Sequence, residues 1–274
     1  YAFIPESIAG YVGADHVAML IGADVYRTPA TTIALDIGTN TEISLFHQGR
    51  IFCCSCASGP AFEGAHISCG MRASSGAIER LRINGQRLSY QTIGNQPPVG
   101  LCGSGILDAV AALRTSGAIN QRGNFDPAFP SVRKAAKNYE YVIVSEAESI
   151  SGKPVTITRA DINEIILAKS AIRAGIEILM RTAGIREEEI ESFIVAGAFG
   201  TFLDIESAVA IGMFPEIPLK KFRQVGNAAG AGARKLLLSS ALRKECSELA
   251  GRMNYVELSA YPDFNDTLVS WMHL

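Results

Sequence analysis

A single acidic residue stands where the first strongly apolar segment of the chain meets a polar turn. Asp36 ends the run TIALD, and the turn GTNT at 38–41 leads into the alternating segment EISLFH at 42–47. Glycine lets a backbone approach a ligand closely, consecutive amides form an anion nest, and threonine hydroxyls donate further hydrogen bonds. Because a carboxylate repels phosphate unless a cation lies between them, Asp36 indicates Mg²⁺ bridged by water. The alternative is an ordinary turn in which Asp and Asn cap their own backbone.

The elements around this turn decide which kind of phosphate site it could be. A dinucleotide-binding unit or a P-loop needs a strand, a glycine-rich loop and then a helix, whose amino terminus holds the phosphate. Here a second strand follows the turn instead. Both of those interpretations therefore lose their structural context, and a phosphate-binding hairpin remains.

Two further glycine-rich turns could contact a flat ligand. The turn AGAFG at 196–200 follows the apolar run FIV, and it suits the face of a purine or a ribose. The turn GNAAGAG at 226–232 opens a long helix, whose amino terminus could lie near a ligand. For Gly230 and Gly232 we prefer the alternative, in which glycine lets a helix pack tightly on its neighbour.

Composition restricts the class of protein. The chain has 274 residues, enough for one large domain or two lobes. Its formal net charge is -2 and it has no Lys/Arg block, so neither nucleic acid nor a membrane surface is indicated as a partner. We see no apolar segment long enough to span a bilayer and no signal sequence, and we expect a cytoplasmic protein. The first residue, Tyr1, suggests part of a longer protein.

Cysteine is concentrated in one region. Cys53-x-x-Cys56 followed by Cys69 could ligate zinc or an iron–sulfur cluster, but a complete site needs a fourth ligand. A disulfide framework is not expected in a chain of this size without a secretory signal. We interpret the cysteines as small buried residues, and the six are Cys53, Cys54, Cys56, Cys69, Cys102 and Cys246.

Predicted strands and helices alternate, which indicates an α/β fold. The segment 159–183 has apolar residues on one helical face, a capping box at Thr158-x-x-Asp161 and a stop at Gly184. The segment 58–79 is expected to be an ordered loop region. The other predicted helices are 7–22, 106–114, 225–245 and 264–272, and the predicted strands are 31–36, 42–47, 50–55, 81–83, 88–93, 193–196 and 255–259.

Together, and in this order, these pieces resemble the sugar kinase, heat-shock protein 70 and actin superfamily of ATP-binding folds. In that fold a connecting helix would correspond to residues 7–22 and a phosphate hairpin to 36–42. An adenosine turn would correspond to 196–200 and a second connecting helix to 226–238. The strings SGPAFEGAHISCGMRA, GLCGSGILDAV and VAGAFGTFLD are similar to the carboxy-terminal ATPase region of reductive activators of corrinoid proteins. That likeness covers almost the whole chain.

The resemblance implies an α/β, actin-like or ribonuclease H-like ATPase fold with mixed sheets flanked by helices, as an incomplete two-lobed unit. We expect residues 1–274 to be the carboxy-terminal part of the ATPase domain. Within it, 1–30 would be the connecting-helix region, 31–158 the phosphate-hairpin lobe with an insertion, and 159–274 the adenosine-binding helices and strands. The family's other phosphate hairpin and its ferredoxin cysteines are expected upstream, because this chain has one hairpin motif and no plant-type cysteine spacing.

The resemblance also implies ATP and Mg²⁺ as cofactors and assigns roles to residues. Asp36 would orient Mg²⁺ or its water, and Asp15 would lie near the attacking water, although Asp15 could equally serve as a favourable charge at a helix amino terminus. His16 and His66 are interpreted as structural. The implied phosphate contacts are Gly38, Thr39, Asn40 and Thr41, and the implied adenosine contacts are Gly197, Ala198, Phe199, Gly200 and Asn227.

Glu63 and Arg72 are further candidates for contact with the nucleotide. They lie in the glycine-rich segment 58–79, which follows the hairpin in the chain. A lone Glu and a lone Arg are more often a surface ion pair that contributes little.

The function implied by the resemblance is ATP-dependent reduction of a Co(II) corrinoid protein of a methyltransferase system. The electron would come from a [2Fe–2S] domain outside this chain, in an anaerobe, and the protein would be a homodimer. One alternative is a small-molecule kinase or an acyl-CoA dehydratase/reductase-type activator, with a cluster bound at a dimer seam by Cys102 or the Cys53–Cys69 group. Another is a non-catalytic dimerisation scaffold whose glycine turns serve packing.

Overall fold

The structure is a computed structural model that describes residues 3–135, 138–149 and 151–274. The chain divides into two compact units. Unit 1 contains the described residues up to Ala57, together with Ile172–Phe202 and Pro215–Leu268. Unit 2 contains the described part of Ser58–Ala171, together with Leu203–Phe214 and Val269–Leu274. The segments 31–158 and 159–274 each contribute to both units.

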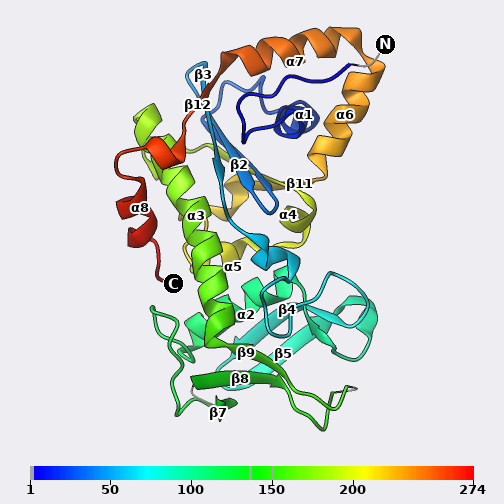
Figure 1. Cartoon of the computed structure of the whole chain (residues 1–274), viewed down its shortest axis with the longest axis vertical. Coiled ribbons are helices and arrows are strands. Elements are labelled where there is room, and N and C mark those ends of the chain that lie inside the picture. The colour runs from blue at the N-terminus through cyan, green and yellow to red at the C-terminus, as the bar shows by residue number, and fades with distance from the viewer. Residues whose placement is uncertain (1–2, 136–137, 150) are drawn as a thin grey trace. The chain divides into compact units, whose positions relative to one another are not determined.

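Unit 1 is built on a six-stranded mixed sheet (Figure 1). Its strands β1, β2 and β3 form an antiparallel meander, β10 and β11 continue the sheet parallel to β1, and β12 is parallel to β3. The order across the sheet is β11 (Phe222–Gly226), β10 (Ser192–Ala196), β1 (Thr32–Ile37), β2 (Thr41–His47), β3 (Arg50–Cys56) and β12 (Met253–Tyr255).

The hairpin predicted at Gln48-Gly49 is confirmed. Both residues have positive φ values, 48° and 76°, and Arg50 pairs with His47 across the turn. Two consecutive residues with positive φ are the signature of the type I′ turn, whose twist matches that of the flanking strands. The three predicted strands at 31–55 therefore form as expected, within one or two residues at their ends.

One face of this sheet is covered by α1 (Ala14–Ala23), α6 (Ala228–Leu238) and α7 (Ser240–Arg252), which surround a core that includes Leu20, Leu236 and Leu249 (Figure 1). The backbones of α1 and α6 are in direct contact. A Cβ on Gly232 would lie 1.7 Å from the Ala18 carbonyl oxygen, and one on Gly22 would lie 2.0 Å from the Ala228 carbonyl oxygen. Helix packing is therefore the role of Gly232.

The other face of the sheet packs on the second half of α3 (Arg159–Ala183). A Cβ on Gly175 would lie 2.3 Å from the Cys56 sulfur and 3.1 Å from the Ile43 side chain. Cys53 is buried in the opposite core, with α1, because successive strand residues face opposite sides. The cysteines of β3 are thus small buried residues that let helices approach both faces.

Within the described residues, unit 2 contains two small sheets, two helices of its own and the first half of α3. The three strands β5 (Arg87–Thr92), β4 (Ala77–Asn84) and β6 (Gly100–Leu101) form one sheet, and β7 (Val132–Ala135), β8 (Asn138–Val144) and β9 (Val155–Thr158) form the other. Helix α2 (Gly103–Ser116) packs on β4 and on α5 (Ile205–Ala210), and it ends at Gly117, as predicted. The capping box at α3 is confirmed, because Thr158 and Asp161 exchange hydrogen bonds between backbone N–H and side chain.

Several sequence-based boundaries were wrong. The helix predicted at 7–22 begins only at Ala14, because Ile8 and Val12 form a turn closed by a backbone hydrogen bond of 2.9 Å. The helix predicted at 225–245 is instead the end of β11 followed by α6 and α7, since Ser239 breaks the run and caps α7. The last predicted strand, 255–259, ends at Tyr255 and gives way to a 3₁₀ turn at Leu258–Ala260.

The terminal helix is present as α8 (Phe264–Ser270). Within the part of the chain that the structure describes, no helix combines the length and apolar character needed to cross a membrane.

Candidate functional site

The turn after Asp36 is a tight hairpin connection. Asp36 pairs with Glu42 and Ile37 with Thr41, which leaves residues 38–40 to form the turn. The Gly38 N–H donates to the Asn40 carbonyl at 3.1 Å and closes it. The three turn residues are exposed, whereas Thr41 is fully buried. A ligand at this turn would thus meet Thr39 and Asn40 first.

Asp36 lies half-buried at the end of β1, just before this turn. Burial, helped by the negative charge of Asp15, raises the pKa of its carboxyl group from 3.8 to about 6. The charged form is therefore disfavoured unless a cation comes close. This electrostatic environment is the one expected of a carboxylate that binds a cation.

The second glycine turn lies directly against Asp36. Gly197 follows β10 with a φ of 94°, in the region that favours glycine, and a Cβ there would come within 2.9 Å of the Asp36 carboxylate and 2.7 Å of the Ile37 carbonyl oxygen. Ala198 then begins the short helix α4 (Ala198–Phe202), which was expected to be part of a turn. Glycine at 197 lets this turn pack closely against Asp36.

The third turn is joined to the second. The Gly197 N–H donates to the Gly226 carbonyl at 3.1 Å. Asn227 is exposed and its side-chain oxygen accepts from the Gly230 N–H at 2.8 Å, so it caps α6. Because β1, β10 and β11 are parallel, all three glycine turns meet at the carboxyl ends of these strands, where ligands collect in α/β folds.

Asp15 stands in the first turn of α1, as predicted for a helix amino terminus, and is exposed. Its carboxylate accepts from the His16 N–H at 3.0 Å, and its charge raises the pKa of both Asp36 and Glu42. Asp15 is therefore electrostatically coupled to the hairpin.

His16 fixes this end of α1 to the hairpin strand. Its Nε2 lies 2.7 Å from the Ser44 hydroxyl on β2, and the ring is buried. Burial lowers the pKa of His16 to about 4, so the ring is neutral at physiological pH. The structural interpretation of His16 agrees with this position.

Glu42 was missed by sequence reasoning. It is paired with Asp36 across the hairpin, so the two side chains lie on the same face of the sheet. Burial first, and then Asp15 and Asp36, raise its pKa to about 7, although a hydrogen bond of 3.2 Å from Ser55 opposes this. The available signal was the spacing: two acids that flank a three-residue hairpin turn symmetrically must be cross-strand partners.

Glu63 and Arg72 belong to unit 2, where both are exposed. Glu63 ends a 3₁₀ turn at Pro60–Glu63. Their proposed contact with the nucleotide stays a prediction.

A mixed sheet that begins with a three-stranded meander, continues with parallel strands and is flanked by helices on both faces defines the actin-like class of ATPase fold. The glycine turns at its strand ends are the features that this class places around a ligand. A family model described as "C-terminal domain of RACo the ASKHA domain" matches residues 30–274. The chain belongs to this family, and the predicted fold class is confirmed.

Individual relatives agree. The chain is 37% identical to "Corrinoid activation enzyme RamQ" of Eubacterium limosum over 95% of its own length and 45% of that protein. It is 29% identical to "[Co(II) methylated amine-specific corrinoid protein] reductase" of Methanosarcina barkeri over 96% of its length and 49% of that protein.

A solved structure described as "Reductive activator for corrinoid,iron-sulfur protein" superposes with a TM-score of 0.92 at 39% identity, covering 99% of this chain and 44% of that one. The chain thus spans less than half the length of each of these relatives.

Proposed function

We propose that the chain is the ATP-binding and ATPase module of a reductive activator, which returns Co(II) corrinoid proteins to Co(I). The family and the names of the relatives support the class of activity. The observation that carries the proposal is the contact between Gly197 and Asp36, because it joins the adenosine turn to the phosphate hairpin at one place.

The residues at this place suit Mg²⁺ held together with a nucleotide. No group of three or more His, Cys, Asp or Glu side chains in the described part of the chain is arranged as a metal site. Mg²⁺ usually keeps several waters and is bound by one or two carboxylates plus substrate phosphates, so it needs no such group. The charged form of Asp36, which burial disfavours, is stabilised by a nearby cation.

Each part of the site then has a role. The exposed residues Thr39 and Asn40 contact the phosphates, Gly38 allows close approach of the backbone, and Asp36 orients the hydrated metal. Thr41, which is buried, anchors the turn at the start of β2. When bound, Mg²⁺ neutralises charge on the phosphates. Gly197, Ala198, Phe199 and Gly200 line the adenosine, with Asn227 next to them.

In this proposal Asp15 orients the attacking water. It is exposed on the first turn of α1, and its field reaches Asp36 and Glu42. The His16–Ser44 hydrogen bond holds this turn against β2, so the acid keeps a constant position relative to the hairpin. Orientation of this kind supplies much of the rate in phosphoryl transfer.

The rest of the activity lies in parts of the protein outside this chain. The electron comes from a [2Fe–2S] domain, the partner is a corrinoid protein of a methyltransferase system, and the activator is a cytoplasmic homodimer. ATP binding or hydrolysis makes the uphill reduction to Co(I) possible.

The test uses the full-length activator, purified anaerobically, with a Co(II) corrinoid protein and a chemical reductant. We expect Co(I) to accumulate, as seen in the visible absorption spectrum, only when Mg²⁺ and ATP are both present. Equal reduction without ATP would contradict the proposal. A bound [4Fe–4S] cluster would favour the acyl-CoA-type activator. Phosphorylation of a small molecule would favour a kinase, and failure to bind ATP or ADP would favour a non-catalytic scaffold.

A further inference from the structure

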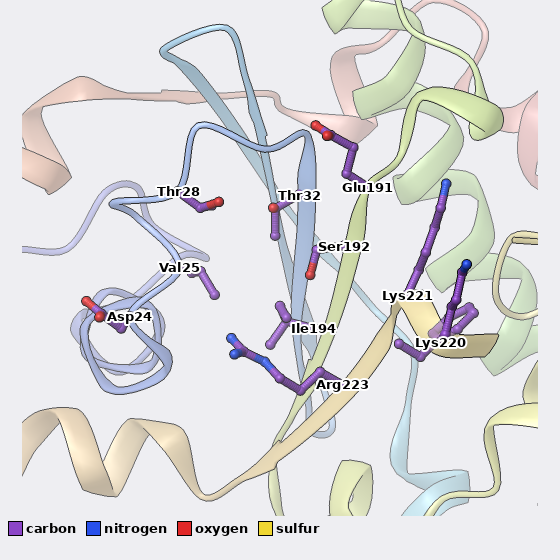
Figure 2. A pocket seen from close by; sticks show the side chains of 11 residues that line it. Asp24, Val25, Thr28, Thr32, Glu191, Ser192, Ile194, Lys220, Lys221 and Arg223 are labelled. Atoms are coloured by element: carbon purple, nitrogen blue, oxygen red, sulfur yellow. The ribbon is translucent and has the colours of Figure 1, made fainter. Parts of the chain in front are cut away.

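Two cavities lined by described residues of unit 1 lie at the end of the sheet opposite to the candidate site. One, of about 320 Å³, lies at the first residues of three parallel strands, Thr32 of β1, Ser192 of β10 and Phe222 of β11 (Figure 2). Asp36 is four residues further along β1, roughly 13 Å away at the rise of a strand. The second cavity, of about 410 Å³, shares Thr28 with the first and extends to the β2–β3 hairpin.

Both cavities are lined by cations. Figure 2 shows Arg223 extending from β11 toward Ile194 and Val25, while Lys220 and Lys221 extend together in another direction. The second cavity has three arginines and no Asp or Glu in its lining. We define the basic face as the six cations of these two cavities: Arg27, Arg50, Lys220, Lys221, Arg223 and Arg252.

The charges of the basic face are only partly compensated. Three acids lie on it or beside it: Asp24, Glu191 and Glu245, the last paired with Arg27 at 2.5 Å. Asp24 is also close to Arg27, at 3.8 Å, and Glu191 accepts from the Thr31 N–H. Among the described residues, none of the other five cations has a carboxylate within ion-pair distance, although the chain as a whole has a net charge of -2.

Backbone carbonyls hold four of these cations in place. Arg50 donates to the Ala183 carbonyl at 3.1 Å, and Arg252 donates to that of Gly49 at 3.4 Å. Lys221 donates to Ile190 and Arg223 to Ala23 in the same way. A carbonyl acceptor orients a cation without cancelling its charge, so the guanidinium groups keep their capacity to bind carboxylates.

We propose that the basic face is a docking surface for an acidic segment of a protein partner. The cations come from four separate parts of the chain and line two adjoining cavities. A single small anion cannot contact all of them. Charge complementarity of this kind sets the association rate and the orientation of a partner. Because the face lies at the opposite end of the sheet, a partner can dock while the carboxyl end is occupied.

The test uses the full-length protein and a fluorescein-labelled octaglutamate peptide, with binding followed by fluorescence anisotropy. We expect saturable binding that weakens steeply as salt rises, and no binding of the matching octaglutamine peptide. The double variant Arg50→Glu/Arg252→Glu should weaken binding at least about 10-fold. The Arg50→Gln/Arg252→Gln variant keeps polar donors at both positions and should weaken peptide binding by about 3-fold or more. It tests the proposal even where the double Glu variant does not fold.

The matched control is Arg234→Glu, an exposed position on α6 that lines neither cavity. It should leave peptide binding unchanged. Equal affinity of the control and the Arg50/Arg252 variants would overturn the proposal. So would displacement of the peptide by inorganic phosphate below about 1 mM, which would indicate a small-anion site.

The proposal is independent of the nucleotide site. ATP binding by the Arg50/Arg252 variants should remain at the level of the unmodified protein, so failure of the docking surface and failure of the proposed function give different results.

Discussion

The two ends of the six-stranded sheet in unit 1 differ in the residues that they present. At the carboxyl ends of β1 and β10, Gly197 packs against the half-buried carboxylate of Asp36, and Gly38 follows Asp36 in the hairpin turn. At the amino ends, cations stand on exposed segments and are held by backbone carbonyls. The same strands therefore separate a site with buried negative charge from a surface with exposed positive charge.

The difference shows how each end would recognise its ligand. Burial disfavours the charged form of Asp36, so this carboxylate suits a ligand that arrives with a cation. Glycine near it allows the backbone to approach such a ligand closely. Exposed cations need no such preparation, because water screens them until a partner arrives. Burial thus distinguishes a site for chemistry from a surface for association.

The largest expected effect is that of Asp36→Ala on ATP turnover. Loss of the carboxylate that orients Mg²⁺ should reduce the Mg²⁺-dependent hydrolysis rate of the full-length protein by roughly 10²–10³-fold. A steady-state phosphate-release assay measures this. The control is Lys244→Ala, whose side chain is 84% exposed on α7 and should leave the rate unchanged. Wild-type turnover by Asp36→Ala would show that the carboxyl end of β1 is not the catalytic end.

The second effect is on stability as a function of pH, without nucleotide or Mg²⁺. Folding raises the pKa of Asp36 from 3.8 to about 6, so between these values the folded chain holds a proton that the unfolded chain has released. The free energy of unfolding then falls as the pH rises through this window, by about 3 kcal/mol in total, and stays lower above it.

Asp36→Asn should abolish that contribution. The free energy of unfolding of the variant, minus that of the unmodified protein, should therefore be larger at about pH 8 than at about pH 3. Urea unfolding at both pH values measures this difference. Glu42, whose pKa is raised to about 7, acts in the same direction and remains in both proteins. A constant difference between the two proteins at all pH values would mean that Asp36 is not in a charge-disfavouring environment.

A third effect concerns the space beside Asp36. In Gly197→Ala the new Cβ would meet the Asp36 carboxylate and the Ile37 carbonyl, and the φ of 94° disfavours any side chain. We expect a loss of about 2 kcal/mol in stability and at least about 10-fold in ADP affinity, measured by thermal unfolding and by calorimetric titration. Unchanged ADP affinity would remove this turn from the site.

The smallest effect belongs to a matched glycine at the other end. Gly49 also has a positive φ, 76°, but a Cβ there would meet nothing within 4 Å. Gly49→Ala should therefore cost only the backbone strain, about 1 kcal/mol, and leave ADP affinity unchanged. If Gly49→Ala reduced ADP affinity as much as Gly197→Ala, the loss would reflect general strain and not the space beside Asp36.

Much of the fold was predictable because its signals are local. The alternating run at 42–47, the Gln48-Gly49 turn and the capped helix α3 each contain the pattern and the stop residue that specify them. Strand β11 was missed because its sequence, FRQVG, is polar at an edge, and its last two residues, Val225 and Gly226, were assigned to the following helix. Strands β8 and β9 were missed although the turn signal Ser151-Gly152 lies between them, and Gly152 has a φ of 65°.

The site was predictable to the extent that it depends on motifs within one segment. Asp36 and Gly197 stood out by their turns, whereas Glu42 required the hairpin register to be known. The basic face gave little signal, because only Lys220, Lys221 and Arg223 are neighbours in the sequence. The other three cations, Arg27, Arg50 and Arg252, come from segments up to more than two hundred residues apart. Only the sheet brings them together.

The most direct test of the nucleotide site is a crystal structure of the full-length protein with Mg²⁺ and a non-hydrolysable ATP analogue. We expect the phosphates at the turn formed by residues 38–41, with the Asp36 carboxylate next to the metal or its waters, and the adenosine against Gly197. Phosphates bound elsewhere, with the turn in contact only with protein and Asp36 far from the metal, would contradict the account.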